Sequence, residues 1–100
     1  MDERTASEIA RAERAKLILE DPMVVAALHD MREHIRNAWE QSPARDKEGR
    51  EELFRYMKVI GNFESAFRTH IGTGEIAAHQ LKTEEERQSV LARLRDKLPF

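Results

Sequence analysis

Apolar residues recur at alternating intervals of four and three along two long segments of the chain, residues 22–41 and 47–71. This spacing places them on one face of an α-helix, so each segment is predicted to be an amphipathic helix with one apolar stripe. The first stripe contains Val24, Leu28, Met31, Ile35 and Ala38, and the second contains Leu53, Tyr56, Ile60, Phe63, Phe67 and Ile71.

Capping residues indicate where these two helices begin. Asp21 precedes Pro22, and aspartate is a good N-cap while proline is well tolerated at the first helical position. Pro43 breaks the pattern after residue 41, and Asp46 is placed to cap the next helix. The connection over residues 42–46 is short, so the helices on either side of it are expected to be antiparallel neighbours.

A shorter helix is predicted on the N-terminal side. Thr5 and Glu8 have the spacing of a capping box, which predicts a helix over residues 6–20. Its apolar side is sparse, with Lys16 among the apolar residues, so we expect this segment to be an arm that docks through its C-terminal end.

A separate helix is also predicted at the C-terminal end. Glycines often end helices, so Gly72-Thr73-Gly74 is expected to stop the helix over residues 47–71, with a turn or two over residues 76–81. Thr83 and Glu86 form a second capping box pattern, and the last helix should stop at Pro99. Its narrow apolar stripe consists of Val90, Leu91, Leu94 and Leu98.

These elements predict an all-α fold. An antiparallel helical hairpin of about residues 22–41 and 47–71 is flanked by the N-terminal and C-terminal helices, and residues 1–100 form a single domain with residues 1–20 as the docking arm. Small domains bury a modest fraction of their surface, so both an oligomeric bundle of hairpins and a four-helix monomer fit this pattern.

Composition narrows the function classes. The chain of 100 residues is 40% hydrophobic and 36% charged, which is typical of a folded domain, and its net charge of −2 gives no overall field for a polyanion. The absence of cysteine excludes disulfides and thiolate metal sites. No apolar run is long enough for a membrane span and no signal peptide is visible, so we expect a cytoplasmic protein that does not contact membranes.

Candidate chemistry is sparse. His29 with Glu33 and Asp30 with His34 are each four residues apart, a spacing that could hold a divalent ion, but each pair lacks a third ligand. The serines and threonines have no context typical of a nucleophile, and Gly72-Thr73-Gly74 lacks the lysine of a phosphate-binding loop. We therefore expect no enzyme activity, no catalytic residue, no metal and no cofactor.

Two features favour a protein interface. Phe54 lies outside the predicted apolar stripe, and Lys58, Gly61 and Ser65 follow it along the same side of the helix. Small residues four apart would let another helix approach closely. The alternative is that the first or the last helix of the same chain covers this side.

Trp39 is the second feature. It lies at the edge of the stripe of residues 22–41, with Arg36 one turn and Arg32 two turns before it. Tryptophan and arginine are enriched where partners bind, so Trp39 and Arg36 are candidate interface residues. Burial of Trp39 in the core of the hairpin is the alternative.

The layout of the chain resembles a group of short helical proteins encoded by tailed bacteriophages and prophages, and residues 19–25 are also similar to a stretch of some small terminase subunits. The resemblance rests on residues 11–15, 17–22, 38–40, 42–46, 50–53 and 72–74. It implies a protein of virion assembly that binds its own copies and another phage or host protein, in the host cytoplasm or the virion. A DNA-packaging subunit similar to a small terminase and an inhibitor of a host enzyme are the alternatives.

Nucleic acid binding has limited support in the residues themselves. Basic residues cluster around the start of the helix over residues 47–71, but acidic residues interleave with them, whereas phosphate binding favours a basic stripe. The helix that begins at Pro22 starts with Met23-Val24-Val25-Ala26-Ala27, and these side chains cannot read base edges by hydrogen bonding.

Overall fold

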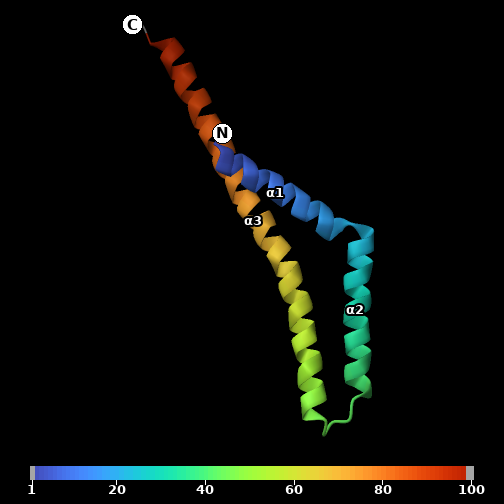
Figure 1. Ribbon diagram of the computed structural model, residues 1–100. Helices are drawn as coiled ribbons and strands as arrows, with labels where there is room; N and C mark the ends of the chain where they lie inside the picture. Colours follow the sequence, from blue (N-terminus) through green and yellow to red (C-terminus); the bar gives the residue numbers. More distant parts are fainter. Residues whose placement is uncertain (1, 99–100) are drawn as a thin grey trace.

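The computed structural model of the protein describes residues 2–98, which form three α-helices joined by short connections (Figure 1). Helix α1 spans Glu3–Glu20, α2 spans Pro22–Gln41 and α3 spans Lys47–Lys97. The prediction of an all-α fold is therefore confirmed. Within residues 2–98, the only non-helical positions between the helices are Asp21 and residues 42–46.

The predicted starts of α2 and α3 are confirmed. The side chain of Asp21 accepts hydrogen bonds from the backbone N–H groups of Met23 at 2.8 Å and Val24 at 3.4 Å. The Asp46 carboxylate accepts from the Gly49 N–H at 3.0 Å. In both cases an aspartate satisfies N–H groups that have no partner inside the first helical turn.

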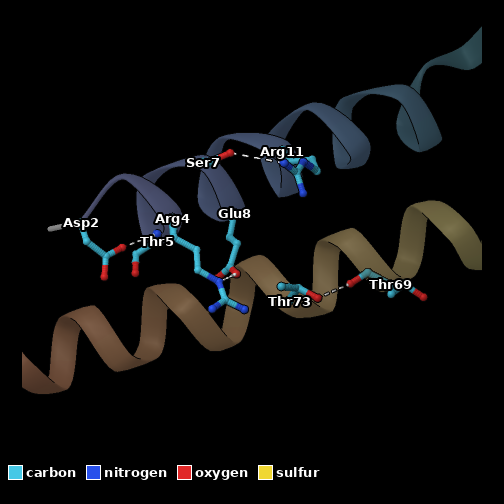
Figure 2. A network of polar contacts seen from close by, with 8 residues as sticks. All are labelled: Asp2, Arg4, Thr5, Ser7, Glu8, Arg11, Thr69 and Thr73. Carbon is cyan, nitrogen blue, oxygen red and sulfur yellow. Dashed lines mark hydrogen bonds and ion pairs between the residues drawn. The ribbon is translucent and has the colours of Figure 1, made fainter.

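The predicted start of α1 is wrong by three residues. Asp2 is the N-cap, and its carboxylate accepts a hydrogen bond from the Thr5 N–H at 2.7 Å (Figure 2). Thr5 therefore lies inside the first turn. Glu8 does not complete a capping box, because its carboxylate accepts instead from Arg4 at 3.3 Å, one turn before it.

The prediction that Gly72-Thr73-Gly74 ends a helix is also wrong. Helix α3 runs through this segment without interruption for 51 residues, a length of about 76 Å at the usual rise per residue. Every glycine has a negative φ, so the left-handed conformation of a helix stop is not adopted. Thr83 and Glu86 consequently lie in the helix interior and not at a cap. The helix ends at Lys97, and Pro99 lies outside the described residues.

Close packing against α1 explains the glycine in this part of α3. A Cβ atom added at Gly74 would lie 2.0 Å from the Ala12 Cβ atom and 2.9 Å from the Glu8 carbonyl oxygen. Ala12, Ala15 and Ala77 are buried at the same contact. Glycine and alanine therefore let the two backbones approach, and α1 docks through its middle instead of its C-terminal end, where Leu17 remains 70% exposed.

The three helices enclose an open triangle. Helix α1 crosses α3 and then diverges from it to meet the start of α2, which returns beside the first half of α3 (Figure 1). The molecule measures 83 × 25 × 20 Å with a radius of gyration of 23.0 Å, whereas a compact chain of this length would have about 13 Å. The last part of α3 projects beyond α1 (Figure 1).

The apolar stripes of α2 and α3 shield each other only in part. Leu28 and Ile60 are buried, but Met31 is 49% exposed and Tyr56 and Phe63 are each 50% exposed. The expectation that the two stripes cover each other is therefore too strong.

The glycine contact gives a matched pair of substitutions in one helix. Gly74→Ala should lower the free energy of unfolding by about 1–3 kcal/mol, because the new methyl group overlaps the Ala12 side chain and the Glu8 backbone. Gly72→Ala should raise it by about 0.5–1 kcal/mol, because no atom lies within 4 Å and alanine favours the helix. Urea unfolding at one protein concentration measures both, and equal effects would contradict the α1–α3 contact.

Candidate protein-interaction surface

An apolar groove runs between α2 and α3, and we refer to it as the α2–α3 groove. One section has a volume of about 350 Å³ and the adjoining section about 450 Å³. Met31, Val59 and Ile60 line both sections, so the groove is continuous. The other lining residues are Val24, Ala27, Leu28 and Phe63 in the first section and Asp30, His34, Ile35 and Tyr56 in the second.

The groove exposes apolar surface that the sequence pattern assigns to helix packing. Val59 is 63% exposed although it lies between the half-exposed Tyr56 and Phe63 on α3. The Phe63 ring packs edge-on against Phe67, with ring centroids 5.1 Å apart. Phe67 in turn lies beside Ala15 and Ile18 of α1. The apolar surface of the groove is thus continuous with the α1–α3 contact.

An ion pair between Arg32 and Glu64 joins α2 to α3. Among the described residues, the other ion pairs each lie within a single helix. The Glu64 side chain is 18% exposed, and it also contacts Arg68 at 3.6 Å. The hydrogen bond from Arg32, with the positive charges of Arg32 and Arg68, lowers the pKa of Glu64 below its ordinary value of 4.5.

Trp39 lies near the connection between α2 and α3 and is not buried. It is 40% exposed, and the Arg50 guanidinium lies 3.9 Å from the centroid of its ring. The contact between Arg50 and Trp39 was not predicted from the sequence, although an antiparallel arrangement about residues 42–46 places positions 39 and 50 at the same level. Arg36, which was expected beside Trp39, forms an ion pair with Glu33 at 3.1 Å.

The structure brings Trp39 and Arg36 together with Phe54. These three residues line one pocket of about 250 Å³, which is completed by Ile35, Leu53 and Met57. The sequence suggested two separate features, but the return of α2 beside α3 makes them neighbours. This pocket is a second open apolar site between the same two helices.

Phe54 borders the pocket beside α2, and the other candidate residues on α3 lie on a side that is largely open. Phe54 is 55% exposed, and the Lys58 ammonium lies 5.5 Å from the centroid of its ring. Ser65 is exposed, and no atom lies within 4 Å of a Cβ added at Gly61. The alternative that α1 or the C-terminal part of the chain covers this side is therefore wrong.

The apolar residues of the last part of α3 are exposed as well. Val90, Leu91, Leu94 and Leu98 are each between 45% and 55% exposed. Sequence analysis assigned them to a separate helix that could fold back. Because α3 is continuous, this stripe instead projects away from the other helices (Figure 1).

The described residues show little that is typical of a reaction centre. Between Asp2 and Leu98, no three side chains of histidine, aspartate or glutamate gather closely enough to hold a metal ion. Asp30 and His34 lie at the groove, and Glu33 is engaged by Arg36. The Tyr56 hydroxyl donates to Glu52 at 2.6 Å, which raises the pKa of Tyr56. No helix in this part of the chain has the length and apolar character of a membrane span.

Comparisons of the chain with protein-family profiles, with curated proteins and with solved structures found no significant match. The surface of the protein is therefore the main indication of its function. Its most distinctive property is a large amount of ordered, apolar helix surface that has no partner within the described part of the chain.

The Arg32–Glu64 pair predicts a pH dependence of stability. A carboxylate whose pKa is lowered on folding stabilises the protein above its unfolded pKa, and this contribution disappears as the pH falls through the lowered folded value. Near neutral pH, Glu64→Gln should lower the free energy of unfolding by about 1 kcal/mol. Towards pH 3, the difference between the two proteins should shrink.

Urea unfolding at several pH values and one protein concentration measures this difference. Glu51→Gln is the control, because Glu51 pairs with Arg55 at 3.7 Å with both side chains largely exposed. Its effect should be close to zero at every pH. A pH-independent effect of Glu64→Gln would show that the carboxylate charge is not what links α2 to α3.

Proposed function

We propose that this chain is a non-enzymatic protein that acts by binding proteins, and first of all further copies of itself. The observation that carries this proposal is its unpartnered surface. The chain exposes 8432 Å², whereas a compact monomer of this size would expose about 5,800 Å². The surplus is about 2,600 Å².

A surplus of this size is at the upper end of the area that each protomer of a permanent homodimer buries. Obligate homodimers bury about 2,000–5,000 Å² in total, which is about 1,000–2,500 Å² on each protomer. The exposed residue types also fit a homodimer interface, because such interfaces are rich in apolar and aromatic residues. The α2–α3 groove supplies Val59, Met31 and Phe63 in that role.

In the proposed assembly, residues 22–41 and 47–71 act as an antiparallel hairpin, and an apolar helix of a second copy fills the groove between them. The result is an oligomeric bundle of helices. Five apolar residues among those described are buried in the single chain, so the second copy would complete most of the core. They are Ala12, Ala15, Leu28, Ile60 and Ala77.

The resemblance to short phage proteins supports a role for this assembly in the building of a virion. A protein of this kind would use one part of its surface for its own copies and another for a phage or host protein. The candidate side of α3 with Phe54, Lys58, Gly61 and Ser65 is suited to the second contact, because it combines an exposed aromatic ring with small residues and a positive charge.

Sedimentation equilibrium of the full chain tests the proposal. We expect a dimer or a larger oligomer at micromolar concentration. Val59→Glu should weaken association by at least about tenfold, because it places a charge in the apolar groove and burial of an unpaired charge is costly. A wild-type chain that stays monomeric would refute the proposal.

Asn62→Glu is the matched control for this experiment. Asn62 lies on α3, is exposed and does not line the groove. Its substitution adds the same negative charge to the same helix and should leave association unchanged. If both variants weaken association equally, the groove is not the contact and general charge repulsion explains the result.

A further inference from the structure

Residues 82–98, which are the last part of α3 and its C-cap Leu98, form a second surface without a partner among the described residues, and we refer to them as the C-terminal segment. Every residue in it is exposed, and it projects beyond the point where α1 crosses α3 (Figure 1). Its apolar residues Val90, Leu91, Leu94 and Leu98 form one stripe.

The other helices of the same chain cannot cover this stripe. At about 100° per residue, Val90 and Leu94 lie about 120–160° around the helix from Ile60, which faces α2. The stripe therefore lies on the side of α3 away from the α2–α3 groove. By its position along the helix and by its direction, the stripe is left uncovered by the other described residues.

The charges of the C-terminal segment are unevenly distributed. Residues 82–89 carry a net charge of −1, because Lys82 and Arg87 accompany three glutamates, and residues 90–98 carry a net charge of +2, because Asp96 accompanies three basic residues. Glu84, Glu85 and Glu86 come before the stripe, and Arg93, Arg95 and Lys97 lie within its second half. Positive residues suit the C-terminal end of a helix. The helix dipole does not explain the acidic run, because α3 is continuous and these residues lie far from its N-terminus.

Within the described residues, these charges form no ion pairs with each other or with the rest of the chain. Glu84 accepts a hydrogen bond from Gln88 at 2.9 Å, which is a contact within one turn of the helix. The two charged groups are thus available to a partner whose own charges run in the opposite order.

We propose that the C-terminal segment pairs with the same segment of a second copy, in antiparallel orientation about a two-fold axis near Val90. Glu86 lies four residues before Val90 and Arg93 three residues after it. They are two helical turns apart and therefore lie on the same side of the stripe. In an antiparallel pair, Glu86 of each copy faces Arg93 of the other, so symmetry forms the contact twice.

The charge order favours this orientation over the parallel one. In a parallel pair, the acidic run of one copy lies beside the acidic run of the other, and the basic residues likewise repel each other. In the antiparallel pair, the half with net negative charge in one copy meets the half with net positive charge in the other. The inference rests on the proposed function, because it names one contact and one orientation within the proposed self-association.

Charge reversal in the full chain tests the orientation. Glu86→Lys alone and Arg93→Glu alone each set like charges against each other twice, and each should raise the dissociation constant about tenfold or more at low salt. The double variant Glu86→Lys/Arg93→Glu restores both attractions, so its dissociation constant should be within about twofold of the wild type. An equimolar mixture of the two single variants should associate with each other as strongly.

Glu85→Lys is the matched control, because Glu85 is a neighbour with the same charge and lies on the side of the helix away from the stripe. It should leave the dissociation constant unchanged, and circular dichroism should show equal helix content in all variants. Sedimentation equilibrium measures each dissociation constant at low and high salt. The differences in dissociation constant between the variants and the wild type should diminish at high salt, because salt screens exposed charges.

The outcomes separate the two proposals. A monomeric wild type refutes self-association and this pairing with it. An oligomeric wild type whose dissociation constant is insensitive to Glu86→Lys and Arg93→Glu refutes the antiparallel pairing and leaves the proposed function intact. Loss of association in the single variants without recovery in the double variant or the mixture also refutes it.

Discussion

The close contact between α1 and α3 at Ala12 and Gly74 determines the shape of this protein. The missing side chain at Gly74 lets the Ala12 methyl group occupy the space that a Cβ atom would need. The contact anchors α1 on the middle of α3, while the connection at Asp21 ties its other end to α2 (Figure 1). Because α1 is attached to α3 by this contact and to α2 by the connection at Asp21, it acts as a spacer between α2 and α3.

The spacer explains why apolar surface remains open in an otherwise well-formed helical chain. Helix α2 can meet α3 near the connection over residues 42–46, where Arg50 lies over Trp39, but it is held away at its start. The Arg32–Glu64 ion pair bridges the two helices between these ends. The groove beside it and the C-terminal segment are both ordered and unpartnered, so each is shaped for association without a large rearrangement of the backbone.

The two proposed contacts use different physical effects. The α2–α3 groove offers apolar area, which provides affinity but little orientation. The C-terminal segment has a narrow stripe with net negative charge before it and net positive charge within it, which provides orientation because only the antiparallel direction brings halves of opposite net charge together. In an assembly that uses both contacts, the α2–α3 groove would provide most of the affinity and the C-terminal segment would set the orientation of the copies.

Local patterns in the sequence were sufficient for the helical class, for both ends of α2 and for the start of α3, because apolar spacing and aspartate caps act within one or two turns. The same local rules failed at Gly72-Thr73-Gly74 and at Thr83. A glycine can end a helix or admit a neighbouring helix, and only the position of Ala12 in space distinguishes the two. The meeting of Trp39 with Phe54, and the exposure of the stripes, likewise depended on where α1 lies, which no short segment of the chain encodes.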